Sequence, residues 1–236
     1  MQRRAPTLIL SFTLLVVMLG YGLVMPIMPF YIERFGAGGT ELGWMMSTYA
    51  LMQLLCAPIW GRLSDRHGRK PILAIGVAGY ALSLLFFGLA TQFWMMFVAR
   101  TLSGILSSAT MPTAMAYIAD RLPEKERSGG MGQLGAATGV GVVIGPVLGG
   151  YLSTDSLALP FFIGSALAGL ALALVVFMLP GFPPTVRGTS PARPRLTLSA
   201  AGALLRSPLG VVLILIFIVS VGLTSFQGIA GLYVVD

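Results

Sequence analysis

The sequence predicts an all-α protein built from transmembrane helices. Apolar residues make up 56% of the chain, charged residues make up 10%, and the mean hydropathy is +0.87. Several apolar runs reach the roughly 20 residues that a helix needs to cross a hydrocarbon core about 30 Å thick. These runs lack the apolar–polar alternation of barrel strands, so helices are expected.

The first apolar run, "LILSFTLLVVMLGYGLVMPIMPFYI", follows Arg3 and Arg4. It is longer than the apolar region of a secretory signal and contains no small-residue cleavage site, so we expect a retained first helix. Five further runs follow at short intervals, and a seventh follows a longer polar stretch. The predicted helices span residues 8–32, 42–60, 71–90, 93–117, 129–152, 158–180 and 208–232.

The longer polar stretch, "GFPPTVRGTSPARPRLTLSAAGALLRS", is rich in Pro, Arg, Ser and Thr and predicts a cytoplasmic linker. Three regions are therefore expected along the chain. They are a six-helix transmembrane bundle over 1–180, the linker over 181–207, and a seventh helix over 208–236.

The positions of the cations predict the orientation of the bundle. With the N-terminus in the cytoplasm, thirteen of the 15 Lys and Arg residues fall in cytoplasmic segments, as the positive-inside rule requires. Arg34 falls on the outer side and Arg100 falls within a helix. This distribution explains the net charge of +7 without a nucleic-acid partner. We expect a multi-pass protein of the cytoplasmic (plasma) membrane.

Charge is concentrated in the turn between the second and third predicted helices, "GRLSDRHGRKPIL". Glycine permits a tight turn, and an aspartate there can accept charge-assisted hydrogen bonds from neighbouring arginines. A loop that merely follows the positive-inside rule explains the cations but not the aspartate or the glycine spacing. The candidate functional residues are Gly61, Asp65, Arg66, Gly68, Arg69 and Lys70.

Arg100 lies inside the fourth predicted helix, with Gly104 one turn later. An arginine at the centre of a membrane costs about 2.5–3.5 kcal/mol on insertion scales, so it normally faces a bundle interior or an aqueous cavity. The alternative is that its side chain reaches back to the outer interface.

The fifth predicted helix contains glycines at every fourth residue, so they share one face and allow another helix backbone to approach closely. Its candidate residues are Gly132, Gly141, Gly145, Pro146, Gly149 and Gly150. The first helix contains a related Gly and Pro pattern, formed by Gly20, Pro26 and Pro29.

Together these four elements resemble those of the major facilitator superfamily, of the drug:proton antiporter type that includes multidrug and tetracycline efflux pumps. The resemblance implies a fold with a six-helix first half followed by a second half. It implies that Asp65 and Arg69 gate the cytoplasmic side, that Arg100 and Gly104 take part in proton coupling, and that the glycine helix limits leak during exchange.

The proton acceptor is not evident, because no acid lies at mid-depth in any predicted span. Glu33, at the end of the first helix, is the candidate, although an interfacial position is the alternative. Tetracycline pumps carry an acid in the third helix, where this chain has Ser83, so tetracycline itself is not the expected substrate.

Polar, aromatic and methionine side chains within the apolar runs are candidates for a substrate cavity. Polarizable methionines and aromatic walls suit loosely specified apolar ligands, although ordinary helix packing is the alternative for each residue. The candidates are Met25, Tyr49, Gln53, Met111, Tyr117, Gln133 and Gln227.

The resemblance implies a secondary active transporter that exports small hydrophobic or drug-like molecules by proton antiport and alternating access. The alternatives are a truncated membrane protein that does not transport, or a transporter of another small solute. The expected partners are the lipid bilayer, a small-molecule substrate, protons and a C-terminal half. No enzyme activity or cofactor is expected, because the single histidine, His67, cannot build a metal or catalytic cluster and no phosphate-binding loop is present.

Overall fold

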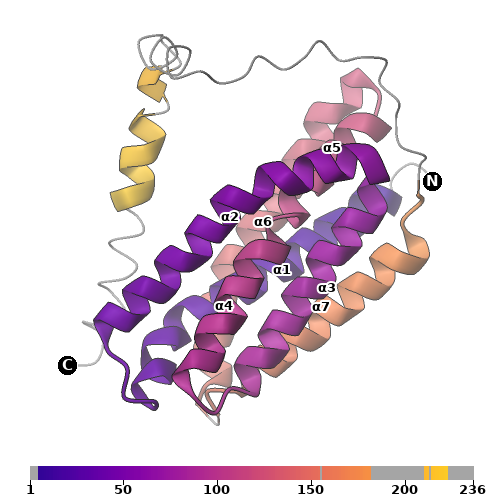
Figure 1. Ribbon diagram of the computed structural model, residues 1–236. Coiled ribbons are helices and arrows are strands. Elements are labelled where there is room, and N and C mark those ends of the chain that lie inside the picture. The colour runs from indigo at the N-terminus through magenta and orange to yellow at the C-terminus, as the bar shows by residue number, and fades with distance from the viewer. Residues whose placement is uncertain (1–4, 155, 182–209, 213, 223–236) are drawn as a thin grey trace. The chain divides into compact units, whose positions relative to one another are not determined.

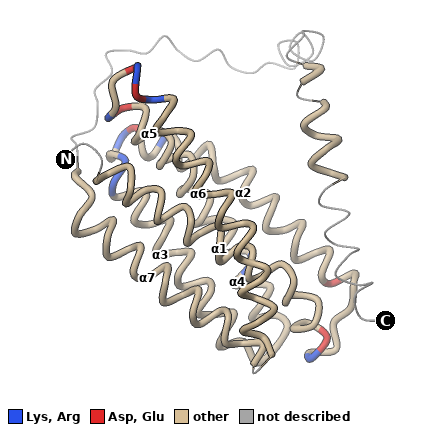
Figure 2. The backbone as a smooth tube through the Cα atoms, turned by 180° about the vertical axis from the view of Figure 1, so that it is seen from behind, with Lys and Arg blue, Asp and Glu red and all other residues tan. Residues whose placement is uncertain are grey.

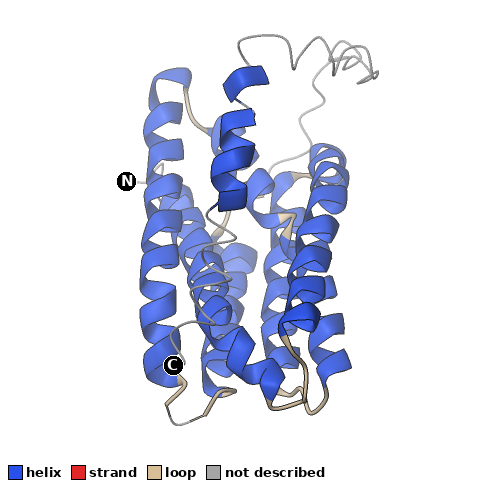
Figure 3. Ribbon diagram, turned by 90° about the vertical axis from the view of Figure 1, so that its left-hand side faces the viewer, coloured by secondary structure: helices blue, strands red, loops and turns tan. Residues whose placement is uncertain are grey.

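The computed structural model describes residues 5–154, 156–181, 210–212 and 214–222. The chain divides into two units, residues 1–185 and 186–236. In the first unit the described residues form helices and connecting turns, without strands (Figures 1 and 3). The helices are α1 Ala5–Glu33, α2 Gly39–His67, α3 Arg69–Gly88, α4 Phe93–Ser107, α5 Thr110–Arg121, α6 Glu124–Leu152 and α7 Leu159–Met178.

Five of these helices are long and apolar enough to cross a membrane, namely α1, α2, α3, α6 and α7. Three of them contain 29 residues, which corresponds to a length of about 44 Å. The helices α4 and α5 are shorter, with 15 and 12 residues. They follow one another along the chain and together cover the fourth predicted span.

The fourth segment is divided between α4 and α5, so the prediction of one uninterrupted helix over 93–117 is wrong in this detail. The carbonyl of Ile105 accepts hydrogen bonds from Trp60 Nε1 at 2.6 Å and from Ser108 Oγ at 2.7 Å. The amide of Ala109 instead donates to Leu106, in a tighter turn. Pro112 follows and has no amide hydrogen to donate to the preceding turn. These hydrogen bonds, together with Pro112, interrupt the helix.

The second helix extends further than the sequence predicted, because the charged stretch continues α2 as far as His67. The turn is therefore reduced to Gly68, which has a φ of +92° and links α2 to α3. Positive φ is strained for residues with a β-carbon, so glycine is the appropriate residue here. Asp65 consequently lies on a helix one turn before Arg69 rather than in a loop.

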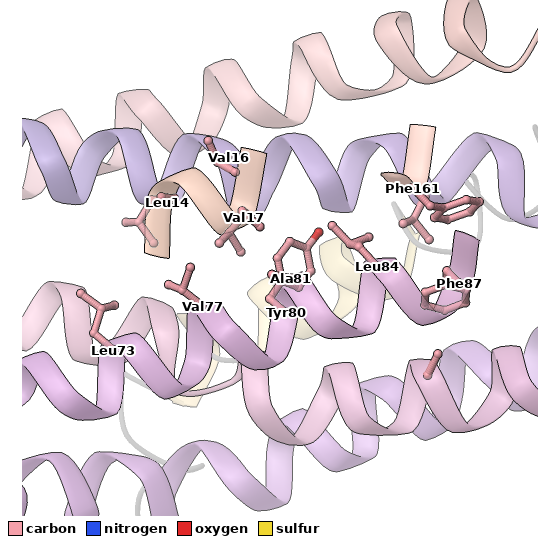
Figure 4. Packing of buried hydrophobic residues seen from close by; sticks show 14 of the residues in the cluster. Leu14, Val16, Val17, Leu73, Val77, Tyr80, Ala81, Leu84, Phe87 and Phe161 are labelled. Carbon is pink, nitrogen blue, oxygen red and sulfur yellow. The ribbon is translucent and has the colours of Figure 1, made fainter. Parts of the chain in front are cut away.

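The core of the first unit lies around α1 and α3. Figure 4 shows side chains of α3 facing those of α1 across an apolar interface, with Phe87 beside Phe161 of α7. The rings of Phe87 and Phe161 stack with centroids 5.4 Å apart, and Tyr31 stacks on Phe161 at 5.3 Å. The Tyr31 hydroxyl donates to the Phe87 carbonyl at 3.1 Å. This aromatic group joins α1, α3 and α7 at one end of the bundle.

The helices α1 and α6 pack most extensively in the unit, and glycines make this possible. A β-carbon at Gly141 would lie 2.5 Å from the Leu15 carbonyl oxygen, and one at Gly145 would lie 2.7 Å from the Cα of Gly22. One at Gly149 would lie 3.0 Å from the Leu23 carbonyl oxygen. The two backbones therefore touch directly over three turns of α6, as the glycine spacing predicted.

The faces of α2 and α6 that point away from the rest of the first unit are largely exposed and apolar. The buried residues of α2 are Met45 and Ser64, while Leu54 is 71% exposed. On α6, Val143 and Val147 are 71% and 70% exposed. Such surfaces suit hydrocarbon or another apolar helix and not water.

Candidate functional site

Charged residues gather at the two ends of the helices, and most of them lie at the end where α5 terminates (Figure 2). Arg69, the first residue of α3, is the centre of the largest group. Its Nη2 lies 2.6 Å from Asp65 Oδ1, and its Nε donates to Asp120 Oδ2 at 3.0 Å. Its Nη1 donates to Ser64 Oγ at 2.6 Å. One guanidinium thus joins α2, α3 and α5.

The Arg69 cluster, formed by Ser64, Asp65, Arg69 and Asp120, is partly exposed. The Arg69 and Asp120 side chains are 20% and 23% exposed, and that of Asp65 is 48% exposed. An exposed ion pair contributes little, about 0–1 kcal/mol, but a fork that engages two carboxylates also fixes geometry. The arrangement can hold three helices together and can release them at modest cost.

The other residues predicted in this turn do not join the cluster. Arg66 and Lys70 form no ion pair with the described acids. A β-carbon at Gly61 would meet nothing within 4 Å, so its surroundings do not require glycine. Asp65, Gly68 and Arg69 therefore have the geometric roles that the spacing suggested.

Arg100 lies in the interior of the bundle and is 3% exposed. Its guanidinium carbon lies 4.1 Å from the centroid of the Tyr49 ring, and its Nη2 donates to Met46 Sδ at 3.4 Å. Its Nε has no hydrogen-bond partner among the described residues. Tyr21 and Tyr80 also lie within electrostatic range of the guanidinium. The alternative position at the outer interface is therefore not adopted.

Gly104 positions the aromatic partner of Arg100. A β-carbon at Gly104 would lie 2.7 Å from the Tyr49 carbonyl oxygen and 3.2 Å from its Cα. Because Gly104 has no side chain, α2 approaches α4 closely, and the Tyr49 ring then covers the guanidinium one turn away. This contact gives a physical reason for the spacing of Arg100 and Gly104.

Gly20 in α1 faces the Tyr80 hydroxyl, which would lie 2.5 Å from a β-carbon at that position. Pro26 and Pro29 lie within α1, which continues past both of them to Glu33. In α6, Gly132 and Gly150 have nothing within 4 Å of a built β-carbon, whereas Pro146 contacts α1 at Gly22. The glycine pattern of α6 therefore meets α1 at Gly22, whereas Gly20 of the first-helix pattern meets α3.

Glu33 and Arg100 are not brought together. Glu33 is exposed at the end of α1, and it forms no ion pair with Arg100. Among the described residues no carboxylate lies within 4 Å of the Arg100 guanidinium. Within the part of the chain that the structure describes, no group of three potential metal ligands occurs either.

The predicted cavity residues are dispersed. Tyr49 stacks on Arg100, and Gln53 Nε2 donates weakly to the Tyr49 hydroxyl at 3.4 Å. The buried Tyr117 donates to the Pro180 carbonyl at 2.9 Å, near the end of the described bundle. Three others are half-buried or exposed, and one lies outside the described residues; they are Met25, Met111, Gln133 and Gln227.

A family model described as Major Facilitator Superfamily matches residues 10–236. The chain belongs to this superfamily. It is 36% identical over 178 residues to multidrug resistance protein 2 of Bacillus subtilis, covering 75% of this chain and 44% of that protein. It is 29% identical over 229 residues to the quinolone resistance protein NorA of Staphylococcus aureus, covering 97% of this chain and 58% of that protein.

Two solved structures of superfamily transporters share the fold. A bacterial homologue of the human lysosomal transporter Spinster, in an inward-facing and unoccupied conformation, superposes with a TM-score of 0.74 at 20% identity over 87% of this chain and 50% of that one. The human organic anion transporter MFSD10 superposes with a TM-score of 0.68 at 24% identity, over 77% of this chain and 49% of that one. The chain spans about half the length of the curated relatives it matches.

The sequence did not indicate several residues of the Arg69 cluster and of the surroundings of Arg100. Asp120, in the last turn of α5, completes the Arg69 cluster. Met46 contacts Arg100, and Tyr21 and Tyr80 lie within electrostatic range of it. A signal was available for Asp120, because an acid at the end of a helix on the same side as the charged turn can reach a cation there. The neighbours of Arg100 come from three other helices, and no local pattern indicates them.

Proposed function

We propose that the chain is part of a secondary active transporter that exports small hydrophobic or drug-like molecules by proton antiport and alternating access. The observation that supports this most directly is the buried Arg100 in a membrane-spanning bundle of a Major Facilitator Superfamily member. A structural helix gains nothing from an intramembrane cation, whereas a transport pathway can use one. The similarity to a Bacillus multidrug resistance protein favours drug-like substrates.

The Arg69 cluster supports a gating role within this proposal. Alternating access requires one end of the bundle to change its contacts while the core moves as a body. The cluster joins three helices through partly exposed ionic contacts, whereas α1 and α6 are joined by direct backbone packing. Ionic contacts at the end of the bundle would exchange during the cycle, and the α1–α6 core would move as one unit.

The charge distribution supports an orientation with the N-terminus and the Arg69 cluster in the cytoplasm, in a plasma membrane. In this orientation Glu33 lies at the outer end of α1, on the side of the membrane opposite to the Arg69 cluster. We propose Arg100 and Gly104 as residues of the coupling pathway. The acid that exchanges the proton is not among the described residues that contact Arg100.

The test is transport by the complete gene product in proteoliposomes, with the neutral fluorescent compound N-phenyl-1-naphthylamine and an imposed pH gradient. Gradient-driven movement is expected for the unchanged protein and for Arg62→Gln, because Arg62 is an exposed cation of α2 outside the Arg69 cluster. Loss of movement is expected for Arg69→Gln and for Arg100→Gln at equal protein content. Movement that ignores the pH gradient would contradict antiport, and unchanged transport by Arg69→Gln would contradict the gating role.

A further inference from the structure

Arg100 is a buried cation whose hydrogen-bonding capacity is mostly unused. A guanidinium has five N–H donors, and carboxylates are the acceptors that match its fork. Here Nη2 donates to a thioether sulfur at 3.4 Å, and Nε donates to no described residue. A thioether is a weak acceptor. The Tyr49 ring covers one face of the guanidinium, so the unused capacity lies along its edge.

A second polar group in the same region is also unpartnered. The Tyr80 hydroxyl is buried, lies against Gly20 of α1, and has no hydrogen-bond partner among the described residues. Tyr80 lies within electrostatic range of Arg100, as does Tyr21. A buried donor without an acceptor is destabilising, so each of these two donors favours a bound acceptor.

We propose that Arg100 forms the recognition site for a carboxylate group on the transported molecule, with the Tyr80 hydroxyl as a second, neutral donor. The ligand class is an aromatic or other apolar organic acid, or a zwitterion with such a group. This inference rests on the proposed transport function and adds the substrate class. Tyr21 and Tyr49, whose rings lie 6.3 Å apart, would contact the apolar part of the ligand.

The ligand carboxylate would replace Met46 as the hydrogen-bond acceptor of Arg100 Nη2. Met46 lies on α2, is partly buried, and belongs to a helix whose outward face is open. Methionine has three rotatable bonds and readily repacks, so the sulfur can leave the guanidinium at small cost. The stacked Tyr49 ring can remain in place while the carboxylate binds the edge of the guanidinium.

Three probes with one ring system isolate the charge that the site recognises. They are 1-naphthoate, the neutral 1-naphthamide and the cation 1-naphthylmethylammonium, and their binding to the complete gene product in lipid nanodiscs can be measured by calorimetry at pH 7. Naphthoate should bind about 10- to 100-fold more tightly than naphthamide, which is the range expected for hydrogen bonds to a charged group. The cation should bind most weakly.

Variants at Arg100 and Tyr80 test the assignment of the donors. Arg100→Gln should remove the preference for naphthoate while leaving naphthamide binding within about threefold, since the amide does not require the charge. Tyr80→Phe should reduce the preference in part. Arg34→Gln, which changes an exposed arginine in the α1–α2 turn, should leave it unchanged. A preference that survives Arg100→Gln would overturn the proposal.

Met46 offers a test that leaves Arg100 intact. Met46→Glu places a carboxylate where the thioether now contacts the guanidinium, so it should abolish the preference for naphthoate and raise the melting temperature. Met46→Gln has a similar shape without the charge and should retain the preference. Equal preferences in these two variants would overturn the proposal even if Arg100→Gln does not fold.

The inference and the proposed function fail in different ways. Equal binding of naphthoate and naphthamide by the unchanged protein would overturn the inference. A carboxylate of the protein itself that already pairs with Arg100 would give this result. Gradient-driven transport of naphthamide in proteoliposomes would in that case still support the proposed function. Absence of gradient-driven transport for all three probes would overturn the proposed function.

Discussion

Replacing Gly145 by alanine should destabilise the α1–α6 contact. A β-carbon at this position would lie 2.7 Å from both the Gly22 Cα and the Leu19 carbonyl oxygen. Both neighbours are backbone atoms, so no flexible side chain can give way and the two helices must separate locally. Inserting a methylene into a well-packed core costs about 1–3 kcal/mol. For a unit of this size, that cost lowers the melting temperature by about 2–12 °C.

The appropriate control is Gly139→Ala, in the same helix, because a β-carbon there would meet nothing within 4 Å. Both substitutions gain the same helix propensity, about 1 kcal/mol. The difference between their melting temperatures therefore reports the α1–α6 contact at Gly145 alone. The melting temperatures of the detergent-solubilised variants can be measured from the fraction that remains monodisperse after heating. Equal melting temperatures for Gly145→Ala and Gly139→Ala would refute the argument that α1 and α6 pack backbone against backbone.

Two further substitutions test the contacts of α4. Gly104→Ala should move α2 away from α4 and lower the melting temperature by several degrees, since its β-carbon would lie 2.7 Å from the Tyr49 carbonyl oxygen. An unchanged melting temperature would contradict the close approach of α2 and α4 at Gly104. Trp60→Phe should release the Ile105 carbonyl and cost about 1 kcal/mol in stability, and an unchanged melting temperature would show that the 2.6 Å hydrogen bond contributes nothing.

The sequence predicted the features that depend on periodicity. Apolar runs of membrane-spanning length gave the helices, and glycines at every fourth residue identified the face of α6 that meets α1. The charged turn was also located correctly, although α2 proved longer and the turn was reduced to Gly68. These signals are local, because a helix has a fixed rise and a fixed number of residues per turn.

Other features depend on side chains that are distant in sequence. The break between α4 and α5 arises because Trp60, 45 residues earlier, binds the Ile105 carbonyl. Similarly, the contact of Arg100 with Met46 joins residues 54 positions apart. The cost of a buried arginine is evident from sequence, but its neighbours follow from the angles at which helices cross, and one sequence does not fix these angles.

The close contact of α1 with α6 has a consequence for how the protein is made. Ninety residues lie between the end of α1 at Glu33 and the start of α6 at Glu124. At synthesis rates of about 5–20 residues per second, α1 waits about 5 to 18 s for its most extensive partner. Through that interval its glycine-bearing face meets lipid or the insertion machinery. A bulky residue on this face would therefore act during biogenesis, so its effect would be seen as lost yield before any loss of activity in the assembled protein.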